Sequence, residues 1–440
     1  MPSRPVSPKR ILIIGGGFAG MYAAIEMKPL TRAGHLVTLV STENFMQYQP
    51  FLPEVASGTI DPRAVVVPLR PVLRHATVSV GEAIAIDHDA HRVEVRIPDG
   101  STVALPYDVL VLAAGSWSRV LPIPGLAEHG VGFMTVQEAI YLRNHVLSRL
   151  DVASETEDPE LRRAALTFLF VGAGYAGVEA LGELEDLARD AMRSYPTLRS
   201  QEMRWILVEA AGRILPELPA DLATYARTQL ERRGIEVLLE TRLASAEGGA
   251  IRLSDGQSFL ADTLVWTAGV KPSPLAELGG FPVDERGRVV VDEHLRVVGV
   301  PDAWAAGDIA AVPDRTTGGL APPTAQHAMR EGRRLGRNVT ASVLGGDLEP
   351  FSWRNVGGVC SLGRYKGVAN VFGIKVKGFA GWFLHRSYHL WAMPTVGRRV
   401  RIALDWTIAL LFPRDIAQLG SFEHPREPFR RAAGGSRDTN

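Results

Sequence analysis

Two stretches of the chain share one pattern of apolar and polar positions. Each opens with a short apolar run, passes through a group of glycines and continues as an alanine-rich stretch; they are Ile11–Met27 and Phe168–Leu184. A continuous apolar run of this length is typical of a strand buried in a parallel sheet. The pattern therefore predicts two strand–turn–helix units of common design.

The glycines between strand and helix have the spacing G-x-G-x-x-G in both copies. Their positions are Gly15, Gly17, Gly20 and Gly172, Gly174, Gly177. In this context the first glycine permits a tight turn, the second lets the backbone approach a pyrophosphate, and the third lets helix and strand pack closely. The helix N-terminus then presents free N–H groups to the phosphates. Each copy therefore predicts a dinucleotide site.

A second repeat follows each glycine motif. An Asp-Gly dipeptide separates short alternating runs at Asp99-Gly100 and again at Asp255-Gly256, which predicts a β-hairpin in each copy. A buried strand comes next, Asp108–Ala113 in the first copy and Thr263–Thr267 in the second. The offset between the copies stays nearly constant. We therefore expect an α/β fold with two Rossmann-like dinucleotide-binding domains, the second inserted in the first.

The order of the motifs sets the expected domain boundaries. The segment Trp304–Asp308 (WAAGD) predicts a further strand end that places Gly307 and Asp308 against the first dinucleotide. The first domain would thus resume after the insertion. The expected parts are residues 8–125 and 281–344 for the first domain, 126–280 for the second, 345–420 for a C-terminal region and 421–440 for a disordered tail.

An acidic residue after the next strand would contact the ribose of each dinucleotide. In the second domain the strand Arg204–Val208 ends at Glu209, whose carboxylate favours NADH because it repels a 2′-phosphate. The segment Arg189–Glu202 before it is expected to be a loop insertion. In the first domain the strand Leu36–Val40 ends at Ser41, so Glu43 is the nearest carboxylate that can take this place.

Composition narrows the class of protein. The 440 residues carry 48 Lys and Arg against 48 Asp and Glu, a balance that argues against nucleic acid as a partner. The one cysteine, Cys360, excludes both a redox pair of cysteines and a cysteine-based zinc site, and no metal site is expected. No uninterrupted apolar run reaches the roughly 18 residues of a membrane-spanning helix.

The motifs taken together resemble a known family. The order GGGFAG, ENFMQYQPFLPEVASG, VLAAGS, VGAGYAGVE, VEAAGRILP, VWTAGVKP, WAAGD and TAQHAMREG is similar to that of flavoproteins with two dinucleotide-binding domains. Within them the resemblance is to the type II NADH:quinone oxidoreductases, the non-pumping NADH dehydrogenases, and runs from about Arg10 to Leu419. It implies FAD in the first domain and NADH in the second.

The resemblance also implies roles for individual residues. Gln47–Pro53 matches the segment that passes the flavin, and Glu179 matches a glutamate near the nicotinamide. Gln326 matches a residue beside the flavin and the quinone, in a pattern whose last glutamine is Arg330 here. The family often has an acid where this chain has Ser41. The remaining cofactor-binding residues implied by the motifs are Asn44, Gly115, Ala268, Gly269, Gly307, Asp308 and Ala325.

The C-terminal region combines aromatic and basic residues. Two helices are expected, Gly378–Ala392 and Arg398–Leu411, separated by Pro394 and Gly397. Such helices suit the surface of a bilayer, with arginines facing anionic headgroups, in a peripheral enzyme on the cytoplasmic face of the cell membrane. The alternative is that they pack on the domain core or form a homodimer interface.

The sequence thus predicts an FAD-dependent NADH:quinone oxidoreductase that does not pump protons. Because Cys360 has no cysteine partner, it is expected to be a small buried residue, and electrons would pass from the flavin directly to an outside acceptor. Two alternatives are a soluble flavoprotein reductase serving an acceptor such as ferredoxin, and a non-catalytic flavoprotein that senses NADH.

Overall fold

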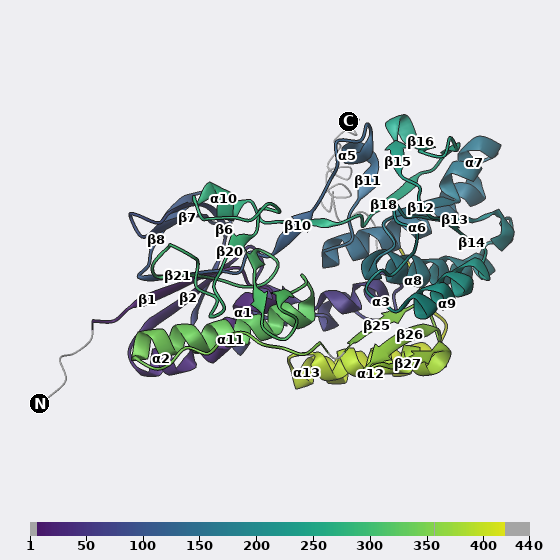
Figure 1. Ribbon diagram of the computed structural model, residues 1–440. Coiled ribbons are helices and arrows are strands. Elements are labelled where there is room, and N and C mark those ends of the chain that lie inside the picture. The colour runs from purple at the N-terminus through teal and green to yellow at the C-terminus, as the bar shows by residue number, and fades with distance from the viewer. Residues whose placement is uncertain (1–6, 356, 419–440) are drawn as a thin grey trace, which may run out of the picture.

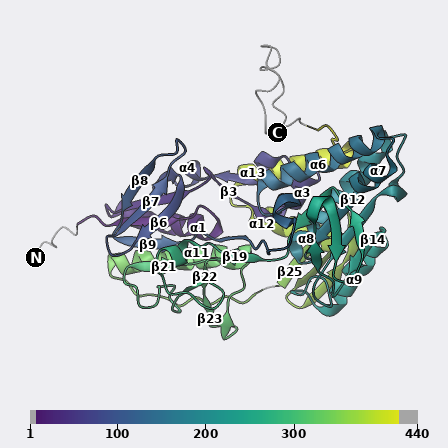
Figure 2. The same cartoon turned by 90° about the horizontal axis from the view of Figure 1, so that it is seen from above.

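The computed structural model describes residues 7–355 and 357–418. The expected tail at 421–440 lies outside the described residues. The chain forms two lobes side by side, and a third, smaller unit lies along one side of them (Figure 1, Figure 2).

The first lobe is built on a five-stranded parallel sheet in the order β21-β9-β1-β2-β5. These strands are β1 (Arg10–Ile14), β2 (Leu36–Ser41), β5 (Thr77–Val80), β9 (Val109–Leu112) and β21 (Ala303–Ala305). Helix α1 (Phe18–Glu26) follows the first glycine motif and packs against α11 (Ala325–Leu344). An antiparallel sheet is added by β6 (Glu82–Asp87), β7 (Arg92–Arg96) and β8 (Thr102–Pro106).

The second lobe repeats this plan with the sheet order β11-β18-β12-β13-β14. Its strands are β11 (Gly130–Val131), β12 (Thr167–Val171), β13 (Arg204–Val208), β14 (Ile235–Leu238) and β18 (Thr263–Trp266). The antiparallel addition is formed by β15 (Leu243–Ser245), β16 (Ala250–Leu253) and β17 (Ser258–Leu260). Its helices include α6 (Val136–Glu155), α8 (Tyr175–Ala191) and α9 (Ala220–Glu231). Both hairpins predicted from Asp-Gly dipeptides are confirmed, β7–β8 and β16–β17.

The connections between the lobes show the insertion. Strand β10 (Ser116–Ser118) leaves the first lobe and pairs antiparallel with β19 (Val270–Pro272), which returns to it (Figure 1). The returning chain then adds β21 to the first sheet beside β9. The expected α/β fold with one Rossmann-like unit inserted in another is therefore confirmed.

The C-terminal unit combines a small sheet with two helices. Strands β25 (Gly357–Ser361), β26 (Gly367–Val371) and β27 (Ile374–Lys377) form an antiparallel sheet, which the sequence pattern did not predict. Helix α12 (Gly378–Ala392) packs on this sheet and has the expected bounds. Helix α13 (Val396–Leu411) begins earlier than expected, so Gly397 lies inside the helix and does not end it. Among the described residues, no helix is both long and apolar enough to cross a bilayer.

The segment Arg189–Glu202 differs from the expected loop. Helix α8 continues to Ala191, and the rest contains the short 3-10 turns Met192–Ser194 and Ser200–Glu202. Leu187, Ala188 and Ala191 are all buried, so the apolar face of α8 extends further than the motif alone indicates.

Candidate functional site: two glycine loops and the cavity at the first

The glycine loop of the first lobe assigns a different constraint to each glycine. Gly15 has φ +113°, and a Cβ there would collide with the carbonyl of Ala113. A Cβ on Gly20 would collide with the carbonyl of Gly15, so this glycine lets α1 pack on β1. A Cβ on Gly17 would meet no atom of the described residues within 4 Å. Protein packing therefore does not require glycine at position 17, and space for a ligand remains beside it.

The glycine loop of the second lobe has the same design. Gly172 has φ +106° and lies against the backbone of Thr267 and Ala268, at the end of β18. Gly177 lies against the carbonyl of Gly172, whereas a Cβ on Gly174 would meet no atom within 4 Å in the part of the chain that the structure describes. Both loops thus leave their middle glycine open beside the N-terminus of a helix, where an anionic pyrophosphate is stabilised.

A cavity of about 630 Å³ opens at the first loop. This volume lies within the range of roughly 300–1,000 Å³ that is typical of cofactor and ligand sites. The site residues predicted from sequence that line the cavity are Gly15, Gly17, Glu43, Gly115, Gly307, Asp308 and Ala325. Gly20, Asn44 and Gln326 were also predicted but do not line it.

The Gly307–Asp308 turn forms one wall of this cavity. The Asp308 carboxylate accepts a 2.8 Å hydrogen bond from the Ser116 hydroxyl, and burial raises the pKa of Asp308. The Gly307 N–H donates a 2.8 Å hydrogen bond to the carboxylate of Glu331, which is fully buried on α11. Burial raises the pKa of Glu331 to about 8. Sequence reasoning missed Glu331, although the position one turn after Ala328 on the same helix was the available signal.

Glu43 lies at the end of the first sheet where a ribose contact was expected. Its carboxylate accepts a 3.0 Å hydrogen bond from the side chain of Gln137, which belongs to the second lobe. Ser41 is buried at the end of β2 and also lines the cavity. Asn44 does not line the cavity, and its carbonyl accepts the N–H of Leu69 at 3.0 Å.

These residues fit FAD. The open position at Gly17, the carboxylate at Glu43 and the polar turn at Asp308 all line one cavity, and they are groups that a dinucleotide needs. The Gln326 Oε1 atom is buried at the start of α11 and has no hydrogen-bond partner in the described chain. A buried amide oxygen without a partner is costly, but Gln326 does not line the cavity and only its neighbour Ala325 does, so the FAD fit rests on the lining residues.

Glu209 lies beside the second glycine loop. Its carboxylate accepts the N–H of Ala173 at 2.7 Å and the N–H of Ala211 at 2.8 Å, and thereby ties the loop to the end of β13. Arg213, the cation nearest to Glu209 along the chain, donates to the carbonyl of Pro216 at 2.5 Å. Ala268 and Gly269 lie at the end of β18, where the chain enters the connection to the first lobe.

Glu179 contacts the C-terminal unit and does not line the cavity. It lies on α8, buried, where it accepts the N–H of Ser361 at 2.8 Å and faces the His385 Nε2 atom at 3.1 Å. Cys360 is fully buried beside it, as expected of a small core residue, and burial and Glu179 together raise the pKa of its thiol.

Arg330, which replaces the expected glutamine, covers α11 at its first turns. Its guanidinium lies 3.9 Å from the ring centroid of Trp353 and donates to the carbonyl of Gln326 at 2.9 Å. Burial lowers the pKa of this guanidinium. Ala325 and Ala328, on the other side of the helix, face the cavity.

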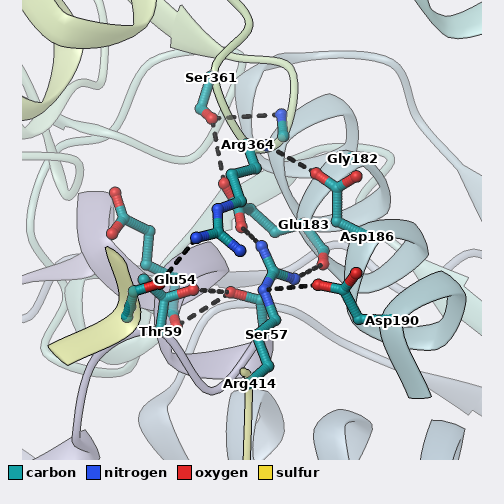
Figure 3. Close-up of polar contacts among 12 residues, drawn as sticks. Glu54, Ser57, Thr59, Gly182, Glu183, Asp186, Asp190, Ser361, Arg364 and Arg414 are labelled. Atoms are coloured by element: carbon teal, nitrogen blue, oxygen red, sulfur yellow. Dashed lines mark hydrogen bonds and ion pairs between the residues drawn. The ribbon is translucent and has the colours of Figure 1, made fainter. Parts of the chain in front are cut away.

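Buried ion pairs fasten the C-terminal unit to the two lobes, and Figure 3 shows the pairs of Arg414 with Glu183 and Asp190. Glu54, in the helix α3 (Leu52–Ala56), accepts hydrogen bonds from Arg386 at 3.0 Å and from the Trp406 indole at 2.6 Å. Arg414 lies 3.5 Å from the carboxylate of Glu183 on α8. The arginines of the two C-terminal helices were expected to face anionic headgroups; for Arg386 this is wrong, because its charge is buried against Glu54.

The outer faces of α12 and α13 are apolar and exposed. Trp382 does not belong to this surface, because it is buried against the small sheet. Arg398 and Arg401 lie on α13 together with apolar residues of this surface. Arg399, on the same helix, donates a hydrogen bond to the carbonyl of Met393. We call this surface the apolar stripe; its residues are Phe379, Phe383, Trp391, Val396, Val400, Leu404, Ile408, Leu411 and Phe412.

Comparison with known proteins places the chain in a family. Residues 9–332 match the family described as pyridine nucleotide-disulphide oxidoreductase. The type II NADH:quinone oxidoreductase Ndh of Mycobacterium tuberculosis is 30% identical over 427 residues, covering 94% of this chain and 90% of the relative. Its counterpart in Staphylococcus aureus is 30% identical over 395 residues, covering 88% of this chain and 96% of the relative.

Solved structures agree on the fold. The structure of NDH2 from Plasmodium falciparum in complex with NADH superposes with a TM-score of 0.86 at 18% identity, covering 93% of this chain and 99% of that one. A ferredoxin reductase from Rhodopseudomonas palustris has a TM-score of 0.64 at 21% identity, covering 84% and 81%. Enzymes with different electron acceptors therefore share this fold. The two sequence relatives, in contrast, are both type II NADH:quinone oxidoreductases. This chain belongs to the pyridine nucleotide-disulphide oxidoreductase family and, within it, to the type II NADH:quinone oxidoreductases.

Proposed function

We propose that this protein oxidises NADH and reduces a membrane quinone, with FAD held in the cavity of the first lobe. The observation that carries the proposal is the presence of two glycine loops, each open at its middle glycine, in one chain of this family. Two such loops accommodate two dinucleotides, a resident one and an exchanging one. The chain has one cysteine, so it cannot form an intrachain disulfide that would relay electrons.

The first lobe would hold FAD through groups already in place. The N–H groups at the start of α1 face the pyrophosphate, Glu43 the ribose, and Asp308 the chain between phosphate and flavin. When bound, FAD supplies the chemistry that accepts a hydride from a nicotinamide and returns electrons to a quinone. Gly115 and Ala325 line the cavity with little side-chain bulk and leave room for the cofactor.

The second lobe would bind NADH. The loop at Gly174 receives the pyrophosphate, and Glu209 accepts hydrogen bonds from the ribose hydroxyls. Because the Glu209 carboxylate is fixed by two backbone N–H groups, its charge stays at the loop and disfavours the 2′-phosphate of NADPH. Ala268 and Gly269 present backbone at the end of β18. Glu179 would act indirectly: its hydrogen bond with Ser361 holds α8 against the C-terminal sheet near the nicotinamide.

The acceptor side would be formed at the start of α11. The buried amide oxygen of Gln326 has no partner among the residues that the structure describes, and this side chain would orient the quinone or the flavin edge. Arg330 covers this helix in place of the usual glutamine and is held by Trp353. The acceptor site would therefore differ in its polar groups from that of relatives with a glutamine there.

The apolar stripe would attach the enzyme to the membrane surface. Apolar side chains on α12 and α13 enter the interface, and Arg398 and Arg401 interact with anionic headgroups. In this position the enzyme receives a quinone from the bilayer while both nucleotide lobes remain in the aqueous phase. We propose that this aqueous phase is the cytoplasm. A homodimer formed through the same stripe is the competing use of this surface.

The test is steady-state oxidation of NADH with a panel of quinones and with ferredoxin. We expect turnover with quinones, a strong preference for NADH over NADPH, and FAD released on denaturation. Turnover with ferredoxin alone would identify the soluble reductase instead. Flavin that NADH reduces but no acceptor reoxidises would identify a sensor.

A further inference from the structure

A short segment of the second lobe lies over the cavity of the first. Met134, Thr135, Gln137 and Glu138 all line the cavity, although they lead into α6 of the inserted domain. The Glu138 carboxylate accepts the N–H of Met134 at 2.6 Å and that of Thr135 at 2.8 Å, which closes a capping box with Thr135. The segment therefore has a defined backbone conformation.

Gln47 of the first lobe binds this segment with both ends of its amide. Its Nε2 donates to the carbonyl of Met134 at 2.6 Å, and its Oε1 accepts the N–H of Val136 at 2.5 Å. Gln49 donates to the same Met134 carbonyl at 3.2 Å. A side-chain amide that pairs with a donor and an acceptor on one backbone segment fixes its position in two directions.

A third glutamine, on the second lobe, donates a hydrogen bond to the first lobe. Gln137, from the second lobe, donates at 3.0 Å to the carboxylate of Glu43 in the first. This bond holds the carboxylate at the cavity wall without neutralising its charge. Glu43 is the acid nearest to the end of β2, where the chain has Ser41, so its orientation decides whether a carboxylate reaches the ribose.

We propose that Gln47, Gln49 and Gln137 form a glutamine clasp that holds the inserted domain over the cofactor cavity and slows the release of FAD. Gln47 is the main positioning residue of the clasp, and Gln137 orients Glu43. The lobes cannot separate at the cavity without breaking these hydrogen bonds. The inference rests on the proposed function, because FAD is the group that the cavity is proposed to hold.

The test compares Gln47→Glu, Gln47→Met and the control Gln201→Glu, a site exposed on the second lobe away from the cavity. Gln47→Glu keeps the acceptor for Val136 but sets a carboxylate oxygen against the Met134 carbonyl. Release of FAD on dilution, followed by flavin fluorescence, should be about tenfold faster in Gln47→Glu, as expected when one partly buried hydrogen bond is lost. Gln201→Glu should match the wild type.

Hydrogen exchange provides a readout independent of the flavin. The Val136 amide should exchange faster in Gln47→Met, which has no acceptor, and remain protected in Gln47→Glu. If the wild type holds FAD and both Gln47 variants release it at the same rate as Gln201→Glu, the proposed clasp is wrong. Wild-type protein that binds no FAD would instead refute the proposed function, and the Val136 exchange would still report whether Gln47 fixes the segment.

Discussion

Gly17 and Gly20 lie in one loop but are constrained by different neighbours. A Cβ on Gly20 meets the Gly15 carbonyl, whereas a Cβ on Gly17 meets only open space. Gly17→Val should therefore fold normally and lose FAD, because the side chain occupies the place of the pyrophosphate. Gly20→Val should lose about 3 kcal/mol or more of stability, because α1 is pushed from β1. Flavin absorbance and thermal unfolding separate the two outcomes, and a yellow Gly17→Val protein would contradict the assignment.

Glu209 combines a structural and a selective role. Glu209→Gln keeps one acceptor for the glycine loop but removes the charge and places an NH2 group against a backbone N–H. The ratio of kcat/KM for NADH to that for NADPH should fall about tenfold, the factor given by one charge-assisted hydrogen bond. Steady-state kinetics with both nucleotides measure this ratio. An unchanged ratio would mean that another group selects the nucleotide.

Glu331 makes stability depend on pH. Its pKa is raised to about 8 by burial, so between its unfolded value near 4.5 and pH 8 the folded protein binds a proton that the unfolded chain does not. The contribution of this group to stability therefore falls as pH rises through that range. Glu331→Gln should be closest to the wild type near pH 5 and relatively more stable near pH 8. Denaturant unfolding at both values tests the sign, and a constant difference would contradict it.

At the scale of elements, one face of helix α13 packs on the protein core and the other face is exposed. Ile402 is fully buried, while Leu404 and Ile408 are exposed in the apolar stripe. Replacing Leu404 and Ile408 by Asp should release the protein from anionic vesicles with little change in melting temperature. Thr224→Asp on the exposed face of α9 adds one negative charge outside the stripe and should leave binding unchanged. Cosedimentation measures both, and full binding of the double variant would favour the dimer interface.

At the scale of the whole molecule, the C-terminal unit is part of the folded core. Arg386→Met would leave Glu54 buried with the Trp406 indole but without its cation, at a cost of about 3 kcal/mol. Glu54→Gln combined with Arg386→Met should recover part of this loss. Denaturant unfolding of the two single variants and the double variant gives the coupling, and independent effects would contradict the buried pair. Removal of the whole unit should be worse, since it also leaves Glu183 without Arg414.

The chain's own local patterns determined much of the architecture. Glycine spacing, apolar runs and Asp-Gly turns act over a few residues, so both glycine loops and both hairpins followed from the sequence, while the insertion followed from the order of these motifs along the chain. The helix Gly378–Ala392 was likewise predicted with its observed bounds. These features depend on the intrinsic geometry of neighbouring residues, which any fold containing them must respect.

Only the tertiary structure decided how distant residues pair. Nothing near Arg386 in the chain indicates that its partner is Glu54, and an arginine among aromatics equally suits a lipid surface. Gln47 and Met134 meet across two lobes, and Glu331 reaches Gly307 from another element. Burial converts each of these polar side chains from a solvated group into one that needs a specific partner, and which partner is near depends on the packing of whole domains.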